Sequence, residues 1–319
     1  MKIGLLTNIE WPFERNEDLA RIAERFGFDQ IWINEHPLDW DPFLVLQRLA
    51  GLVPGIPLGI GTINPWARHP AVIAASAATL SRATGVPFVL GIGSGAPPLF
   101  PPIGIEPANV IAGTEESVRI MRALVAGQES TFSGSVFSTK GAKLTFGPTE
   151  QVSVLLGVSG GPKMLKVAGV AADGVIVPAG NHAFYQSVIG EYITHRGQAA
   201  STGEASEVVV NGNILVGDGE SVEKEARSRL AHSLEYRAKT SAHALKRMNV
   251  ELEEAKRWAN APEEIPRQLL EESILWGSPE NCVTRLRELE ALGVTQYVLR
   301  FPSIEEAKEV GESVLPLLR

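Results

Sequence analysis

The chain has 319 residues, of which 44% are hydrophobic and 21% are charged, an ordinary balance for a globular protein. Its net charge of -8 disfavours nucleic acid as a partner, because phosphate binding requires a concentrated basic surface. No apolar run approaches the roughly 20 residues of a membrane helix, and no secretory signal precedes the apolar stretch Met1–Asn8. We therefore expect a cytoplasmic protein that neither binds nucleic acid nor spans a membrane.

The cysteine and histidine content argues against a metal centre. Cys282 is the single cysteine, which excludes an internal disulfide and a cysteine-based metal cluster. It lies in the helical pattern Pro279–Leu289, where a buried structural thiol is expected. The six histidines are too scattered along the sequence to indicate a metal site, so none is predicted.

Short apolar runs alternate with helical stretches along the chain. In order, the predicted elements are strand Lys2–Thr7, helix Glu14–Phe26, strand Asp29–Asn34, helix Pro42–Leu52, strand Pro57–Thr62, helix Pro70–Thr84, strand Pro87–Gly93, helix Gly113–Ala126, strand Val152–Val158, helix Pro162–Ala171, and strands Gly174–Pro178, Val208–Val216 and Thr295–Phe301. Most of the strands are continuously apolar, which is typical of a parallel sheet covered by helices on its faces. The alternation fits either a doubly wound sheet or a barrel, and eight strands favour a (β/α)8 TIM barrel.

Two segments interrupt the alternation within what we expect to be one domain over residues 1–319. Glu129–Gly147 is rich in Ser, Thr, Gly and Phe and is interpreted as a hairpin-like insertion. Glu220–Pro279 is longer than one helix requires, and an insertion is placed near residues 240–278. This second segment either covers the end of the barrel or forms a peripheral, solvated helix.

In a barrel, the loops that follow the strands build the active face, and this selects the candidate catalytic residues. Glu35 and His36 follow the second strand, and Glu10 follows the first. Histidine titrates near neutrality and can transfer a proton at working pH. Glu10 is the alternative acid, with a pKa raised by burial, unless it is an ordinary surface carboxylate. We expect Glu35 to orient His36.

Candidate ligand-binding residues follow the third, fourth and fifth strands. Ser159, Gly160 and Gly161 precede Pro162 at the start of a helix, where free backbone N–H groups attract phosphate and Lys163 adds charge. A plain tight turn explains the same residues equally well. Further candidates at the strand ends are Trp40, Gly61, Thr62, Asn64 and Ser94.

Four stretches together resemble the bacterial luciferase-like superfamily, in particular its deazaflavin-dependent branch, which includes methylenetetrahydromethanopterin reductase. They are IWINEH at Ile31–His36, the segment Leu58–Leu80, FVLGIGSG at Phe88–Gly95, and Ser159–Gly174. The resemblance implies a barrel that binds coenzyme F420, with the cofactor phosphate at the fifth loop. It also implies an acid and a histidine at Glu35 and His36, a tryptophan at Trp40, and a non-proline cis peptide at Gly61–Thr62.

The resemblance also sets limits on the substrate. Its sugar-phosphate dehydrogenases carry a carboxylate just after the fourth strand, where this chain has Ala96, Pro97 and Pro98, which argues against glucose 6-phosphate. The leading hypothesis is hydride transfer between F420 and a small organic substrate, by a homodimer. The alternatives are an FMN-dependent monooxygenase and a non-catalytic flavin-binding barrel.

Overall fold

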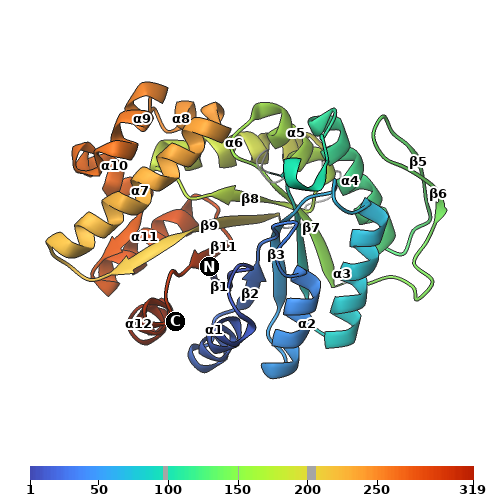
Figure 1. The fold of residues 1–319 in the computed structure, drawn as a ribbon, viewed down its shortest axis with the longest axis horizontal. Helices are drawn as coiled ribbons and strands as arrows, with labels where there is room; N and C mark the ends of the chain where they lie inside the picture. The colour runs from blue at the N-terminus through green and yellow to red at the C-terminus, as the bar shows by residue number, and fades with distance from the viewer. Residues whose placement is uncertain (96–99, 150, 200–205) are drawn as a thin grey trace.

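The computed structural model describes residues 1–95, 100–149, 151–199 and 206–319. Eight parallel strands close into a barrel, in the order β1, β2, β3, β4, β7, β8, β9, β11 and back to β1. Their bounds are β1 Lys2–Leu6, β2 Gln30–Ile33, β3 Leu58–Ile63, β4 Phe88–Ile92, β7 Val152–Gly157, β8 Gly174–Pro178, β9 Glu207–Val216 and β11 Gln296–Arg300. The predicted TIM barrel is confirmed, with all eight strands at the predicted places (Figure 1).

Helices surround the strands. They are α1 Phe13–Phe26, α2 Pro42–Leu52, α3 Pro70–Thr84, α4 Val110–Val125, α5 Pro162–Ala171, α6 His182–Ala199, α7 Glu220–Thr240, α8 Ala242–Arg247, α9 Leu252–Asn260, α10 Arg267–Ser273, α11 Pro279–Ala291, α12 Ile304–Ser313 and α13 Leu315–Leu318, with short 3-10 helices at Pro101–Ile103 and Pro262–Glu264. Local signals set their ends. Asp41 accepts from the amides of Phe43 and Leu44 to cap α2, and Gly27 ends α1 in the left-handed conformation.

A single indole dominates the barrel interior. Trp32 packs there with one apolar side chain from each of six other strands: Leu6, Val89, Leu155, Ile176, Val209 and Val298. The neighbouring strands make room for it with glycines: a Cβ on Gly4 would lie 2.9 Å from the indole, one on Gly59 2.7 Å and one on Gly61 3.1 Å. The larger apolar core lies between the strands and the surrounding helices.

The end of β3 is irregular. The Gly61–Thr62 peptide bond is cis, as predicted, and the register between β3 and β4 shifts between Ile60 and Ile63. Thr62 packs against Gly93, which follows β4, and Gly157 of β7, because a Cβ on Gly93 would lie 2.4 Å from its Oγ1 and one on Gly157 2.7 Å from its Cγ2. The side chain of Thr62 is therefore directed over β4 and β7.

The segment interpreted as a hairpin-like insertion contains an antiparallel pair, β5 Ser130–Ser133 and β6 Ser138–Ala142, which lies beside α4 (Figure 1). The Glu116 carboxylate of α4 accepts the backbone N–H groups of Ser135, Val136 and Phe137 at the tip. Although burial opposes ionisation, these hydrogen bonds hold the pKa of Glu116 below its ordinary value. One buried carboxylate thus fixes the hairpin tip to the barrel.

The second predicted insertion is helical and runs from α7 to α10. It ends in a short strand, β10 Leu275–Gly277, which pairs with the C-terminal end of β9. Two contacts place its first part at the C-terminal end of the strands, which we call the barrel mouth. Arg237 of α7 donates to the carbonyl of Ala179 after β8, and Ser241 donates to that of Ser159 after β7. This part therefore borders the mouth and is not a detached surface helix.

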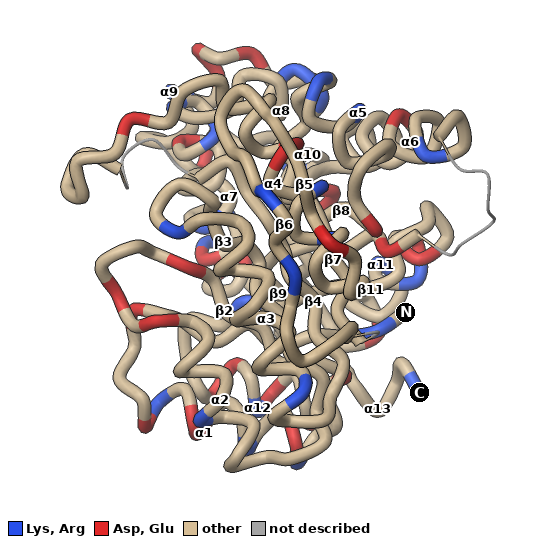
Figure 2. The backbone as a smooth tube through the Cα atoms, turned by 90° about the vertical axis from the view of Figure 1, so that its right-hand side faces the viewer, with Lys and Arg blue, Asp and Glu red and all other residues tan. Residues whose placement is uncertain are grey.

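Acidic and basic residues are interspersed along the chain, as Figure 2 shows for one side of the molecule. Within the residues that the structure describes, no helix is both long and apolar enough to cross a bilayer.

Candidate active site

The candidate residues lie on loops at the barrel mouth, as expected for positions that follow parallel strands. Glu10 follows β1, Glu35 and His36 follow β2, and Asn64 follows β3. The turn of residues 159–161, which we call the glycine turn, follows β7 and begins α5.

The Glu35 side chain forms hydrogen bonds with Asn64 and not with His36. Its Oε2 accepts from the backbone N–H of Asn64 at 2.9 Å and from Asn64 Nδ2 at 2.7 Å. Burial raises the pKa of Glu35 to about 6, although the Asn64 hydrogen bonds and the Arg68 charge favour the ionised form. The predicted orientation of His36 by Glu35 is therefore wrong, because the Glu35 carboxylate is directed at the loop after β3.

Asn64 is a buried connector between loops. Its Oδ1 accepts from the amides of Trp66 and Ala67, at 3.0 and 3.1 Å. Trp66 Nε1 in turn donates to the carbonyl of Ser94 at 2.9 Å, which links the loops after β3 and β4. The side-chain amide of Asn64 is thus engaged with protein groups, and we assign it to the support of the site.

His36 has carboxylate partners from two loops. Its Nδ1 lies 3.0 Å from Glu10 Oε1 and 3.2 Å from Asp39 Oδ2, and its Nε2 lies 3.4 Å from Asn34 Nδ2. The side chain of Glu10 is 57% exposed, as in the surface-carboxylate alternative, and the partly buried carboxyl of the site is Glu35. The carboxylate oxygens of Glu10 and Asp39 and the ring nitrogen of His36, which could act as metal ligands, lie within 4.8 Å of one another. This geometry alone does not define a metal centre.

Trp40 is 47% exposed and packs against Phe13 at the start of α1, with ring centroids 4.7 Å apart. Arg68 pairs with Asp41 at 2.6 Å, and His69 caps α3 by accepting from the amide of Ala71. Arg68 and His69 therefore fix the loop after β3.

The glycine turn has the features expected of an anion site. Gly160 has φ +94, which favours glycine, and Gly161 is the N-cap of α5 with Pro162 at the first helical position. Among the described residues, neither the Gly160 nor the Gly161 amide donates a hydrogen bond. Ser159 and Lys163 are exposed beside them. Unpaired amides at the positive end of a helix attract phosphate.

Sequence reasoning missed the partners that the second insertion provides. Ser241 donates to the carbonyl of Ser159, Arg247 donates to that of Gly160, and the His243 ring lies beside Gly161. The sequence analysis proposed only that this segment covers the end of the barrel. It named neither the residues that make the contacts nor the loop that they contact.

Arg300, at the end of β11, was also missed. It lies on the same side of the strand as Val298, whose side chain faces the barrel interior, so Arg300 is directed toward the mouth. Arg300 is exposed as a residue, but protein atoms around its guanidinium lower its pKa by desolvation, an effect that the Glu10 charge opposes. Arg300 lies inside the predicted strand Thr295–Phe301, so a criterion based on the loops that follow the strands did not select it.

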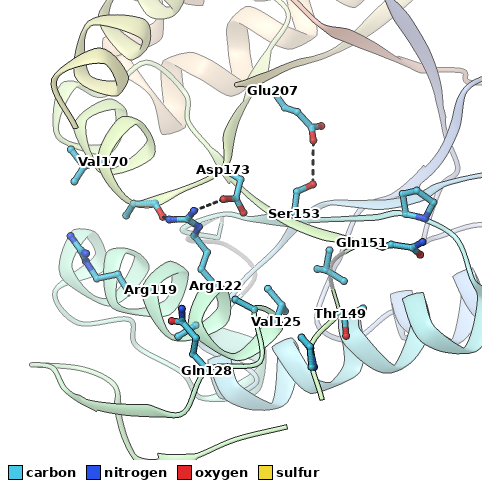
Figure 3. Close-up of a pocket in the computed structure, with 16 residues that line it drawn as sticks. Arg119, Arg122, Val125, Gln128, Thr149, Gln151, Ser153, Val170, Asp173 and Glu207 are labelled. Carbon is cyan, nitrogen blue, oxygen red and sulfur yellow. Dashed lines mark hydrogen bonds and ion pairs between the residues drawn. The ribbon is translucent and has the colours of Figure 1, made fainter. Parts of the chain in front are cut away.

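A cavity of about 970 Å³ lies at the opposite end of the barrel (Figure 3). Its lining includes Pro87, Ser153 and Glu207, at the N-terminal ends of β4, β7 and β9. The ion pair between Arg122 and Asp173 spans 2.6 Å at its edge. In TIM barrels this end serves stability, so the cavity is not the active site.

Fold and loop geometry together define a TIM-barrel protein whose site is built by the loops at the mouth. Residues 1–296 match the family model of the luciferase-like monooxygenases, and the chain belongs to this family. The family predicted from the four sequence stretches is therefore confirmed.

Individual relatives are similar over the full length or about half of it. The chain is 27% identical over 334 residues to 5,10-methylenetetrahydromethanopterin reductase of Archaeoglobus fulgidus, with 100% of both chains covered. It is 32% identical over 177 residues to the F420-dependent glucose-6-phosphate dehydrogenase of Nakamurella multipartita, with 51% of each covered. The coenzyme F420 dependent tetrahydromethanopterin reductase from Methanopyrus kandleri has the same fold, with a TM-score of 0.84 at 22% identity over 100% of this chain and 99% of that one.

Proposed function

We propose that the protein is an oxidoreductase that transfers a hydride between coenzyme F420 and a small organic substrate. The names of the relatives support the cofactor. The observation that carries the proposal is the glycine turn, whose two unpaired amides lie at the same end of the barrel as His36. An anion site fits a phosphorylated ring cofactor, and a proton-transfer group at the same end of the barrel fits a reaction in which a proton accompanies the hydride.

The residues at the mouth fit such a cofactor. Gly160 and Gly161 would bind its phosphate through their N–H groups, with Lys163 adding positive charge. Trp40, Thr62 and Ser94 stay predicted contacts, as does the Gly61–Thr62 cis peptide. When bound, the deazaflavin would give or take the hydride, and the protein would supply position and proton transfer.

His36 is proposed to move the proton that accompanies the hydride. The Glu10 and Asp39 carboxylates both face Nδ1, so they favour the tautomer that carries its proton on Nδ1. Nε2 is then the atom that accepts a proton from the substrate or, after protonation of the ring, donates one to it. Glu10 and Asp39 thus take the orienting role predicted for Glu35, while Glu35 fixes the adjacent loop through Asn64.

The substrate is proposed only as a class. Ala96, Pro97 and Pro98, the positions that argue against glucose 6-phosphate, lie outside the described residues. An FMN-dependent monooxygenase is the alternative that the family description supports, because an anion site of this kind suits either phosphate. A non-catalytic flavin-binding barrel is the third possibility.

Titration with F420 and FMN, followed by turnover assays, separates these functions. We expect tight binding of F420 and its reduction or reoxidation in the presence of an organic substrate. Preferential binding of FMN with oxygen-dependent turnover would instead identify the monooxygenase. Tight binding without turnover in any assay would identify the sequestering barrel.

We further propose a cytoplasmic homodimer. Exposed apolar side chains on the adjacent helices α2 and α3 support a two-fold contact, with Leu44 69% and Val72 53% exposed. Light scattering should give twice the 34.3 kDa mass of the chain, and a monomer at working concentration would contradict the assembly.

A further inference from the structure

The glycine turn after β7 is held in place by the insertion that precedes β10. Ser241 Oγ donates to the carbonyl of Ser159 at 2.9 Å. Arg247 Nε donates to the carbonyl of Gly160 at 2.7 Å. Both donors lie more than 80 positions along the chain from their acceptors, at the two ends of the segment that contains α8.

These two contacts fix the direction of the unpaired amides. In a trans peptide the carbonyl and the following N–H lie in one rigid plane and point in opposite directions within it. Because the Ser159 carbonyl faces Ser241, the N–H of Gly160 points away from the insertion. Because the Gly160 carbonyl faces Arg247, the N–H of Gly161 does the same.

Arg247 is itself fixed by its guanidinium group. Its Nη1 donates to Ser187 Oγ and its Nη2 to Glu191 Oε2, each at 2.5 Å, and both acceptors belong to α6. The side chain is 15% exposed. The guanidinium therefore joins α6, α8 and the glycine turn in one geometry, which the single ammonium group of a lysine cannot reproduce.

We propose that Arg247 and Ser241 are positioning residues for the cofactor phosphate, acting through the Ser159 and Gly160 carbonyls to direct the amides of Gly160 and Gly161. The inference rests on the proposed function in assigning a phosphorylated cofactor to this turn. It makes the insertion a part of the cofactor site, although neither side chain need touch the ligand.

The test compares cofactors with and without a phosphate in Arg247→Lys and Ser241→Ala. F420 is paired with its phosphate-free deazaflavin nucleoside, and FMN with riboflavin, and dissociation constants are measured by fluorescence. We expect about tenfold weaker binding of the phosphorylated member in each variant, which corresponds to the loss of one hydrogen bond, and unchanged binding of the phosphate-free member. Arg257→Lys, at a 60% exposed arginine of the same insertion, is the matched control and should change neither constant.

Equal weakening of both members, or no weakening of either, would overturn the inference. Arg247→Lys retains the charge, so a loss of phosphate binding in it reports the geometry of the guanidinium. Thermal unfolding identifies a variant that has lost its fold, in which case Ser241→Ala decides the outcome. If the protein binds FMN and not F420, the proposed function fails while the FMN and riboflavin pair still tests the turn. A protein that binds neither phosphorylated cofactor contradicts both.

Discussion

Glu35 and Asn64 are joined by two hydrogen bonds to a single carboxylate oxygen, one from the Asn64 backbone and one from its side chain. This arrangement links the loops after β2 and β3. It also places a carboxyl group where burial disfavours its charge, so Glu35 makes the stability of the protein depend on pH.

The first prediction concerns this pH dependence. Because the folded-state pKa of Glu35 is about 6, above its ordinary value of 4.5, the folded state binds the proton more tightly than the unfolded state. The contribution of Glu35 to the free energy of unfolding is therefore highest below pH 4.5 and falls by up to about 2 kcal/mol as the pH rises through 6. Glu35→Gln keeps an oxygen acceptor for Asn64 and removes the titration.

Denaturant unfolding of the wild type and Glu35→Gln at pH 4.5 and pH 7.5 measures this effect. The stability of Glu35→Gln relative to the wild type should increase between the two pH values. A difference that does not change with pH would show that Glu35 titrates normally.

The second prediction separates His36 from its carboxylate partner. His36→Ala should lower kcat by ~10²–10⁴-fold with little change in cofactor affinity, because it removes the proton-transfer group. Glu10→Gln should cost less, about tenfold, because Asp39 also faces Nδ1. If His36 only packs in its loop, His36→Ala will instead lose thermal stability and cofactor binding together.

Recording pH–rate profiles assigns the titrating group. A limb near neutral pH that persists in His36→Ala would move the proton-transfer role elsewhere. Glu35, with its pKa of about 6, is then the first candidate, and Glu35→Gln would remove the limb.

The third prediction tests the close approach of a ligand to the glycine turn. Gly161 has ordinary extended geometry, with φ -69, and the nearest atom to an added Cβ is His243 Cδ2 at 3.8 Å. Gly161→Ala should therefore change the free energy of unfolding by less than about 1 kcal/mol, yet weaken F420 binding where the phosphate occupies that space. Gly160 is unsuitable, since its φ of +94 makes any substitution strained.

Gly190→Ala is the control for this variant, because a Cβ on Gly190 in α6 meets nothing within 4 Å. It should leave cofactor affinity unchanged. Wild-type affinity in Gly161→Ala would remove the turn from the binding site.

The fourth prediction concerns the single thiol. Cys282 is fully buried in α11, and burial raises its pKa to about 12, so almost no thiolate forms at pH 8. A thiol-specific disulfide reagent should leave the native protein unmodified and titrate one thiol after denaturation. Rapid reaction of the native protein would contradict the structural role predicted from the sequence.

Sequence patterns predicted the barrel because most of its strands are continuous apolar runs, which is typical of burial on both faces. They did not identify α6 or β10. The exposed Ile193 blurs the apolar face of α6, and β10 has only three residues, too few for a periodic signal.

The site was predicted less completely than the fold. Position after a strand is a local property, and it placed His36 and Glu35 at the mouth. The partner of each side chain depends on loop conformation, so the contacts of Glu35 with Asn64 and of Arg247 with Gly160 could not be read from spacing. The cis peptide at Gly61–Thr62 came from family resemblance alone.

Trp32 also limits how this barrel can change. The Trp32 indole packs in the barrel interior beneath the loops. Three glycines on its two neighbouring strands, Gly4, Gly59 and Gly61, leave the space that the indole occupies. A smaller residue at position 32 would leave a void that no single substitution refills, because Gly4, Gly59 and Gly61 each border only part of the ring. A larger side chain at any of the three would collide with it. The packing of the barrel interior beneath the mouth therefore depends on four positions that must change together, whereas the loops at the mouth can change independently of them.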